Sequence, residues 1–249
     1  MFGLRRKEAW HKPAPGYGWI QGREMLDEAH TLIAGSTGCG KSTAIHSLIW
    51  TAIQRTPEQT QLVFIDMKRG VEMNRYRSLP HTIGFARTAS EALSVLDGVI
   101  NLMQKRLDGM CAVGSTMFSG ADVYVVIDEL AFLLQTCGQD ALRRLTLISQ
   151  QGRAARVHLL MASQNPSKAG IPAAIQQNMT CCLGLGCRDA IQSRQIIGMP
   201  GCEQLPPHGE GLLLQGRTLR RLAIPMIPEA DIATRIAYWS NPANYTYYK

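Results

Sequence analysis

The sequence lacks the features that mark membrane, secreted and zinc-binding proteins. It has no run of 18 apolar residues, because its longest apolar stretch, residues 123–134, is interrupted by Asp128 and Glu129. No apolar segment follows the basic N-terminus, so we expect no signal peptide. The seven cysteines form no Cys-x-x-Cys pair, which argues against zinc and favours free thiols in a reducing compartment. We therefore expect a cytoplasmic protein without an intrinsic membrane span.

Negative charge is in the minority. The 19 Asp and Glu residues are outnumbered by 26 Lys and Arg residues, which gives a formal charge of +7. This excess favours a polyanionic partner, and it leaves DNA, RNA and an acidic membrane surface equally open. The 249 residues, 45% hydrophobic and 18% charged, have an ordinary globular composition and suit one α/β domain with a sizeable core.

Short apolar runs alternate with longer helix-like stretches from residue 31 onward. The runs are nearly continuous, as is typical of strands in a parallel sheet that helices cover on both faces. We predict strands over residues 31–34, 61–65, 123–127 and 157–161, with edge strands at 182–185, 211–215 and 222–224. We predict helices over residues 41–55, 88–108 and 139–155. This order predicts an α/β fold with a mostly parallel, doubly wound sheet flanked by helices.

A phosphate-binding motif follows the first predicted strand. Gly35-Ser-Thr-Gly-Cys-Gly-Lys41-Ser42 fits the P-loop pattern Gly-x4-Gly-Lys-Ser/Thr and directly precedes a predicted helix. In this context, backbone N–H groups of the loop and of the helix N-terminus converge on a phosphate. Lys41 is expected to reach the β- and γ-phosphates of ATP, and Ser42 to offer its hydroxyl to Mg²⁺. The predicted ATP-binding residues are Gly35, Ser36, Thr37, Gly38, Cys39, Gly40, Lys41, Ser42 and Thr43.

Two adjacent acids end the predicted strand over residues 123–127. Asp128 is expected to hold Mg²⁺ together with Ser42, directly or through the water shell of the ion, and Glu129 to polarise the attacking water. The alternative is a pair of acids at a helix N-terminus, which the helix dipole would favour. Beside the phosphate-binding motif, we favour the catalytic interpretation.

Polar residues also follow two other predicted strands. Gln164 ends the strand that begins at residue 157, where it can sense the γ-phosphate or the attacking water; the alternative is a turn residue before a proline. Asp66 and Lys68 follow the strand over residues 61–65. Because ligands of open α/β sheets bind beyond the carboxyl ends of the strands, these two lie near the site or a subunit edge. A solvated surface ion pair is the equal alternative.

Several arginines lie on or just after the predicted helix over residues 139–155. A helix C-terminus favours cations, so the simple explanation is dipole complementarity and solvation. The sharper hypothesis is that one of them reaches the γ-phosphate of a neighbouring subunit as an arginine finger. The candidates are Arg153 and Arg156, with Arg143 and Arg144 earlier on the helix.

Together these segments resemble the motor domain of the FtsK/SpoIIIE/HerA group of DNA translocases, over residues 29–227. The region from Ala29 to Ile49 is similar to the phosphate-loop region of that family well beyond the motif itself. Further similar segments are Phe64-Ile-Asp-Met-Lys68, Ser78-Leu-Pro-His81, Val126-Ile-Asp-Glu-Leu-Ala131, Arg153-Ala-Ala-Arg-Val-His158, Ala162-Ser-Gln-Asn-Pro-Ser167 and Ser193-Arg-Gln-Ile-Ile197. Six ordered motifs at compatible spacing are far more specific than a P-loop alone.

The resemblance implies a RecA-like P-loop NTPase that forms a hexameric ring, with ATP sites between subunits and DNA in the central channel. It favours Arg153 over Arg156 as the finger that acts on the neighbouring subunit. It also implies that Arg194, in the Ser-Arg motif, contacts the DNA backbone, since phosphate contacts without base contacts suit a sequence-independent pump.

The chain departs from the family pattern at two channel positions. An expected arginine is Asn165, and an expected lysine is Gln176. Lys168 and Arg188 lie a few residues away and could compensate as DNA contacts.

No membrane anchor precedes the expected motor domain, and residues 228–249 are too short for a winged-helix domain. We therefore expect a compact motor from a mobile element or virus, serving genome packaging or conjugative transfer. Its expected partner is a portal, a relaxase or a membrane channel, and a membrane or capsid partner could recruit it.

Two other functions stay open at this point. Type VII protein-secretion ATPases share the motor fold and its motifs, and an assembly factor could bind ATP without pumping anything. Glu129 and Gln164 argue against the second, because a switch has little need of a catalytic acid. In every case we expect residues 1–28 to be an N-terminal segment, residues 29–227 the motor domain, and residues 228–249 a C-terminal helix and irregular tail.

Overall fold

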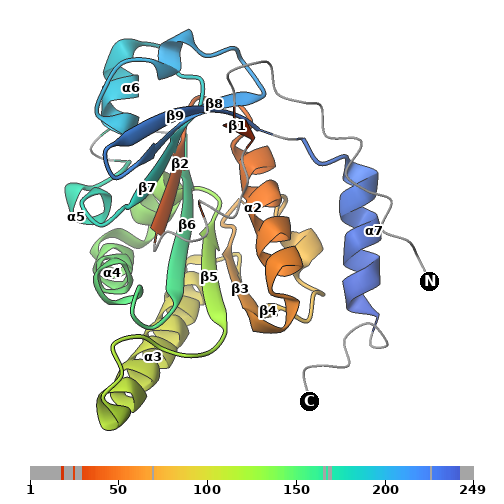
Figure 1. The fold of residues 1–249 in the computed structure, drawn as a ribbon, viewed down its shortest axis with the longest axis vertical. Coiled ribbons are helices and arrows are strands. Elements are labelled where there is room, and N and C mark those ends of the chain that lie inside the picture. The colour runs from red at the N-terminus through yellow and green to blue at the C-terminus, as the bar shows by residue number, and fades with distance from the viewer. Residues whose placement is uncertain are drawn as a thin grey trace.

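The computed structural model describes residues 18–19, 25, 30–68, 70–164, 167, 170–224 and 226–241. In these ranges the chain forms one nine-stranded sheet in the order β1-β9-β8-β7-β2-β6-β5-β3-β4 (Figure 1). The strands are β1 (Gly18–Trp19), β2 (His30–Ala34), β3 (Thr60–Ile65), β4 (Thr82–Ala86), β5 (Asp122–Ile127), β6 (Val157–Ser163), β7 (Cys181–Gly184), β8 (Glu210–Gln215) and β9 (Thr218–Ala223).

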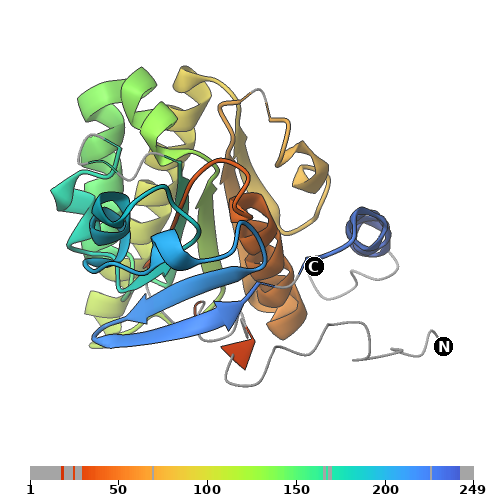
Figure 2. The same cartoon turned by 90° about the horizontal axis from the view of Figure 1, so that it is seen from above.

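The sheet is parallel from β7 to β4, while β8 runs antiparallel to both β7 and β9. The helices are α2 (Lys41–Arg55), α3 (Ala89–Val113), α4 (Leu130–Gln151), α5 (Ala173–Gln176), α6 (Ala190–Ile197) and α7 (Glu229–Ser240), with 3₁₀ turns η1 (Pro57–Gln59), η2 (Asn74–Tyr76) and η3 (Cys202–Gln204). Helix α2 covers one face of the sheet and has α7 beside it, whereas α3 and α4 cover the other face (Figures 1 and 2). The fold is therefore the predicted doubly wound α/β sheet.

The central strands β2, β5 and β6 are buried at every position and mostly apolar, because helices cover both of their faces. In β2, Leu32 and Ala34 pack among the apolar residues of α3 and α4, and Ile33 packs on the other face with Ile45 of α2. Since strand side chains alternate between faces, a strand covered on both sides needs apolar residues throughout. The continuous runs in the sequence thus have their explanation in the two helical layers.

Two sequence predictions differ from the structure. Helix α4 begins at Leu130, directly after Glu129, and not at residue 139. The apolar run over residues 123–134 joins a strand to a helix, and Gly138 interrupts α4 with a φ of 56°, so periodicity showed only the second half. Strand β4 was not predicted, because it is a partly exposed strand at one end of the sheet with Gly84 inside it.

Strand order brings the predicted site residues to one edge of the sheet. Strand β2 lies between β7 and β6, and β5 and β3 follow β6. Because all of these strands are parallel, the segments after β2, β3, β5 and β6 leave the sheet at the same edge. These segments carry the phosphate loop, Asp66, Asp128 and Gln164.

A charged cluster closes the opposite edge. Asp122 is buried at the start of β5 and accepts two hydrogen bonds from Arg156, at 2.9 and 2.6 Å, and lies 2.9 Å from His158 Nε2. Burial alone would raise the pKa of Asp122, but the hydrogen bonds from His158 and Arg156 outweigh it and lower this pKa below its ordinary value. The side chain of Arg156 therefore has a structural role in this ion pair. Its backbone has a positive φ of 55°.

We expect Asp122→Asn to lower the free energy of unfolding by about 1–3 kcal/mol, because it leaves Arg156 without its buried carboxylate. The loss is present above the ordinary pKa of 3.8 and fades as the pH falls through the lowered pKa of the folded state, where the wild-type carboxyl is protonated. Urea unfolding at several pH values measures it. The exposed pair Asp97–Arg144 supplies the control, since Asp97→Asn should cost less than about 1 kcal/mol. Equal losses in the two variants would contradict the assignment.

Candidate functional site

The phosphate loop is a tight turn between β2 and α2. Gly38 and Gly40 have φ angles of +80° and +99°, a region that residues with a Cβ rarely enter. Gly40 is the residue immediately before α2, so the free N–H groups of the first helical turn lie just beyond the loop. Thr37, Gly38 and the four residues from Gly40 to Thr43 line a common pocket, as the motif predicts for a phosphate-binding loop.

Gly35 is needed for a different reason, which is close packing. A Cβ at this position would lie 2.7 Å from Cys39 Sγ and 2.8 Å from Leu185 Cβ. The loop is also tied to two other segments, since Gly35 N donates to Ser163 O at 3.3 Å and Ser36 N donates to Gly186 O at 2.9 Å. The curvature of the loop thus depends on β6 and on the segment after β7.

Lys41 lies under the loop, with its ammonium hydrogen-bonded to Gly35 O at 2.9 Å and Ser36 O at 2.6 Å. Burial lowers the pKa of Lys41, while the nearby Cys39 and Glu129 act in the opposite direction. Burial raises the pKa of the Cys39 thiol, so this cysteine is a packing residue of the loop rather than a ready nucleophile. The ammonium faces the pocket that an incoming phosphate would enter.

The two acids after β5 have different environments. Glu129 stands at the N-cap of α4 but does not cap it; its carboxylate accepts hydrogen bonds from Ser163 Oγ at 3.3 Å and Gln164 N at 3.1 Å. Glu129 thus lies at a helix N-terminus, as the alternative supposed, but its carboxylate is bound by β6 and caps no backbone N–H group, and its catalytic role stays a prediction. Burial, together with the negative charge of Asp66, Glu72 and Glu129, raises the pKa of Asp128, and Lys68 opposes this shift.

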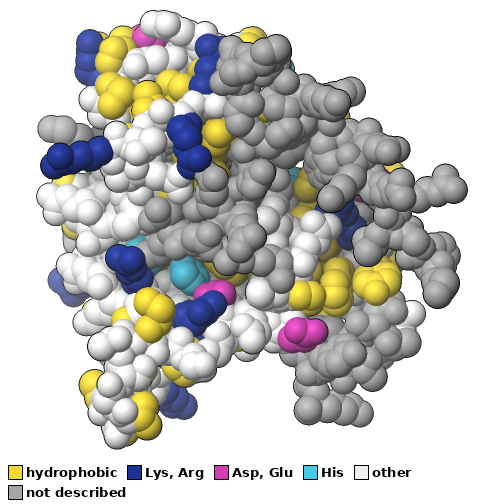
Figure 3. All heavy atoms as spheres, viewed as in Figure 1, with side chains coloured by type: hydrophobic (Ala, Val, Ile, Leu, Met, Phe, Trp, Pro, Cys, Tyr) yellow, Lys and Arg dark blue, Asp and Glu magenta, His cyan; other side chains and the backbone are white. Residues whose placement is uncertain are grey.

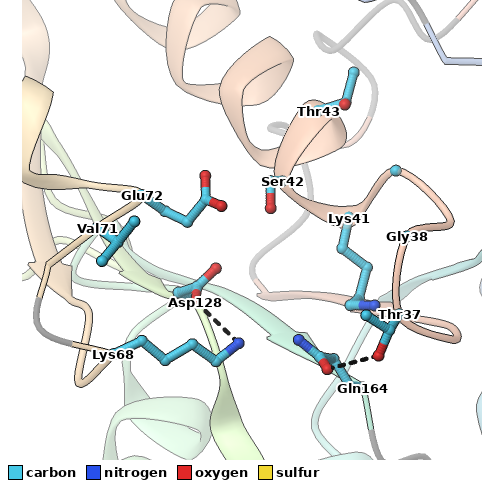
Figure 4. Close-up of a pocket in the computed structure, with 11 residues that line it drawn as sticks. Thr37, Gly38, Lys41, Ser42, Thr43, Lys68, Val71, Glu72, Asp128 and Gln164 are labelled. Atoms are coloured by element: carbon cyan, nitrogen blue, oxygen red, sulfur yellow. Dashed lines mark hydrogen bonds and ion pairs between the residues drawn. The ribbon is translucent and has the colours of Figure 1, made fainter.

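These groups surround a pocket of about 530 Å³ (Figure 4). Gln164 lines it and accepts a hydrogen bond from Thr37 Oγ1 at 2.9 Å, which joins the tip of β6 to the phosphate loop. The lining residues are Thr37, Gly38, Gly40, Lys41, Ser42, Thr43, Lys68, Val71, Glu72, Asp128 and Gln164. Six of these eleven belong to the predicted phosphate loop and first helical turn.

Asp66 and Lys68 belong to the site and are not a surface ion pair. The carboxylate of Asp66 is fully buried and accepts hydrogen bonds from the backbone N–H groups of Lys68, Glu72 and Met73. The ammonium of Lys68 turns instead to Asp128, 3.5 Å away. Sequence reasoning did not single out Glu72, whose carboxylate points into the pocket opposite Asp128 (Figure 4). Glu72 lies seven residues after the end of β3, so the rule that site residues directly follow strands did not point to it.

The residues present fit a magnesium ion. Asp128 Oδ2 is buried and receives no hydrogen bond from any residue that the structure describes. The Ser42 hydroxyl points into the same pocket (Figure 4). A carboxylate and a hydroxyl beside a phosphate site are the oxygen ligands that Mg²⁺ takes in nucleotide-binding proteins. Ser42 and Asp128 are therefore the residues that would hold it.

No arginine lines this pocket among the described residues. Arg153 is exposed in the turn that follows α4, at the edge of the sheet opposite the pocket, and Arg156 and Arg144 are engaged by Asp122 and Asp97. Arg153, like Arg143 on α4, has an exposed side chain that a neighbouring molecule could reach. Its role as a finger stays a prediction.

Of the predicted DNA contacts, Arg188 and Arg194 do not line the pocket. Arg194 is exposed on α6 and Arg188 on the segment before it, while Lys168 and Asn165 fall outside the described residues. Gln176 uses its amide to donate to Gln195 O at 2.9 Å, which ties α5 to α6. On the face of Figure 3, Lys and Arg side chains stand as separate groups and form no continuous basic patch among the side chains drawn in colour.

With this geometry established, comparison with known proteins gives a consistent result. Residues 18–122 match the model of the FtsK/SpoIIIE family. The chain is 30% identical over 244 residues to a protein of Tropheryma whipplei named DNA translocase FtsK, covering 88% of this chain and 33% of that protein. It thus spans about a third of the length of this curated relative.

Solved structures show the same fold. The conjugation coupling protein TcpA of pCW3, solved with ATPγS, matches with a TM-score of 0.74 at 21% identity, over 85% of this chain and 65% of that chain. The type VII secretion ATPase EccC of Thermomonospora curvata matches with a TM-score of 0.70 at 24% identity, over 84% of this chain and 28% of that chain. The fold is that of P-loop ATPases. None of the helices in the described ranges is long and apolar enough to cross a membrane.

We expect Gly35→Ala to weaken nucleotide binding at least about tenfold, because the added methyl must displace Cys39 or Leu185 and so change the curvature of the loop. Isothermal titration with ATPγS measures the effect. Gly98→Ala is the matched control, since Gly98 lies on the exposed side of α3 and an added methyl there would meet open space, and it should bind as wild type does. Normal affinity in Gly35→Ala would show that the loop tolerates the methyl.

Proposed function

We propose that this chain is an ATPase that couples ATP hydrolysis to movement along DNA, because its residues 18–122 match the model of the FtsK/SpoIIIE family. The observation that carries the proposal is that Lys41, Ser42 and Asp128 line one pocket at the carboxyl edge of the sheet, and that Glu129 accepts a hydrogen bond from the backbone N–H of Gln164, which lines the same pocket. We assign the motor to residues 29–227, with residues 1–28 and 228–249 outside it.

The roles of the residues follow from where they lie. The backbone N–H groups of residues 37–38 and 40–43, which line the pocket, bind the phosphates, and Lys41 exchanges its bonds to the loop carbonyls for phosphate oxygens. Mg²⁺, held by Ser42 and Asp128, would supply positive charge to the phosphate that is transferred. Glu129 takes the proton of the attacking water. The side chain of Gln164 senses the γ-phosphate, and its backbone N–H donates a hydrogen bond to Glu129.

The site is completed by a second copy of the chain. Because no described arginine lines the pocket and Arg153 is exposed at the opposite edge of the sheet, Arg153 is placed to serve a neighbour rather than its own nucleotide. A ring of six subunits closes such head-to-tail contacts and leaves a channel for DNA. Arg188, Arg194 and Lys168 contact the DNA backbone in that channel, without base contacts.

For the biological process, we propose genome packaging or conjugative transfer by a virus or mobile element. The likeness to TcpA, named as a conjugation coupling protein, supports the second of these. A portal, relaxase or membrane channel is the partner on which such a motor would dock. The likeness to EccC keeps protein secretion as the alternative, and DNA dependence separates the two.

The test is steady-state ATP hydrolysis with and without long duplex DNA, across a salt series. We expect hydrolysis to rise several-fold with DNA and to fade as salt displaces the protein from phosphates. Lys41→Ala, which removes the phosphate-binding ammonium, is the blank. Hydrolysis that ignores DNA at low salt would refute translocation and leave protein secretion or assembly as the function.

A mixing experiment tests the shared site. Arg153→Ala alone should hydrolyse ATP at least about a hundredfold more slowly, because an arginine finger contributes that much or more. Mixed with Lys41→Ala, it should regain activity, since some interfaces then pair an intact Lys41 with an intact Arg153. Lys105→Ala, which removes an exposed cation of α3 that has no proposed role, is the control and should behave as wild type. Full activity of Arg153→Ala by itself would exclude the finger.

A further inference from the structure

Lys68 reaches the two acids that the proposed mechanism uses. Its ammonium lies 3.5 Å from Asp128 Oδ2 and 3.7 Å from Glu129 Oε2. Asp128 Oδ2 is the same buried oxygen that receives no hydrogen bond from the described residues and that would face a metal ion. In Figure 4, Lys68 extends across the floor of the pocket toward Asp128, so a lysine nitrogen lies beside the oxygen of the proposed metal position.

The backbone that carries Lys68 is rigidly held. Buried Asp66 accepts hydrogen bonds from Lys68 N at 3.1 Å, Glu72 N at 3.1 Å and Met73 N at 3.0 Å, and Gly70 N donates to Asp66 O at 3.1 Å. Gly70 has a φ of +78°, which closes the loop. The loop therefore presents Lys68 from a fixed base, while its side chain is 41% exposed and has room to swing away.

The balance of charge explains why a cation is needed there. Asp128 and Glu129 are largely buried side by side, and Glu72 adds a third carboxylate to the pocket. Lys41 acts on Glu129 only from a distance, because its ammonium is hydrogen-bonded to the carbonyls of the phosphate loop. Two buried carboxylates without a counter-charge would repel each other and also repel a nucleotide phosphate. Of the described residues, Lys68 is the one whose ammonium is within 4 Å of both.

We propose that Lys68 is a built-in substitute for the metal ion: it neutralises Asp128 and Glu129 while no Mg²⁺ is bound, and it gives way when the ion arrives. An ammonium and Mg²⁺ cannot share Asp128 Oδ2, because like charges at that separation repel strongly. The partly exposed side chain of Lys68 can move from Asp128 into solvent at little cost in free energy, whereas the buried carboxylate of Asp128 stays in place. The empty site is thus ready for a nucleotide before the metal ion is in place.

The consequence is that nucleotide binding depends less on metal than it would without Lys68. This inference rests on the part of the proposed function that places ATP in the pocket, and it is independent of DNA. With Lys68 present, a free nucleotide meets a neutralised site. Without it, the acids are neutralised only by Mg²⁺.

The experiment measures ATPγS affinity by isothermal titration, once with excess Mg²⁺ and once with EDTA, for wild type and Lys68→Met. In EDTA we expect Lys68→Met to weaken ATPγS binding about tenfold, because the variant loses one partly exposed positive charge beside the two acids. With excess Mg²⁺ we expect the loss of affinity to be less than about twofold. Lys68→Arg keeps the charge and should restore metal-free binding. Lys105→Met removes an exposed lysine of α3 and should match wild type in both conditions.

Two outcomes overturn the inference. Equal affinities of Lys68→Met and wild type in EDTA would make Lys68 a solvated side chain without influence on the site. An equal loss with and without Mg²⁺ would make it a direct phosphate ligand instead. Thermal unfolding of each variant confirms that it is folded. If wild type binds ATPγS but DNA leaves hydrolysis unchanged, translocation fails and this inference stands; if wild type binds no nucleotide, both fail.

Discussion

Buried negative charge at one edge of the sheet is the constraint on which the site depends. Asp66, Asp128 and Glu129 leave the sheet from neighbouring parallel strands, so their carboxylates are close together and largely out of water. Each is compensated differently: backbone N–H groups bind Asp66, Lys68 faces Asp128, and the tip of β6 donates to Glu129. A buried charge that lacked such partners would cost several kcal/mol, so these contacts are part of the fold as much as of the chemistry.

The phosphate loop depends on the same neighbours. Its bonds to Ser163 and Gly186 come from the strands on either side of β2, and Thr37 reaches Gln164 at the tip of β6. The phosphate loop and Glu129 are thus joined through Gln164 by two hydrogen bonds. In the proposed mechanism, this path would link the nucleotide to the acid that activates water.

Much of the fold and site could be predicted because the signals are local. Continuous apolar runs indicated the central strands, and the spacing of Gly35, Gly40, Lys41 and Ser42 indicated the loop, since backbone geometry over eight residues requires it. The start of α4 was missed because the buried strand β5 and the apolar first turn of α4 form one continuous run in the sequence. Strand β4 was missed because partial exposure and Gly84 weaken its pattern.

The sequence alone determined the fold class, the phosphate loop and the pair of acids, because each of them produces a pattern among residues that are close together along the chain. Only the tertiary structure decided which side chains contact one another. It showed that Arg156 belongs to Asp122, that Glu129 turns away from its own helix, and that Lys68 faces Asp128 instead of Asp66. Those choices depend on which strands lie side by side, and strand order is set by the packing of the whole sheet, where residues far apart in the chain meet.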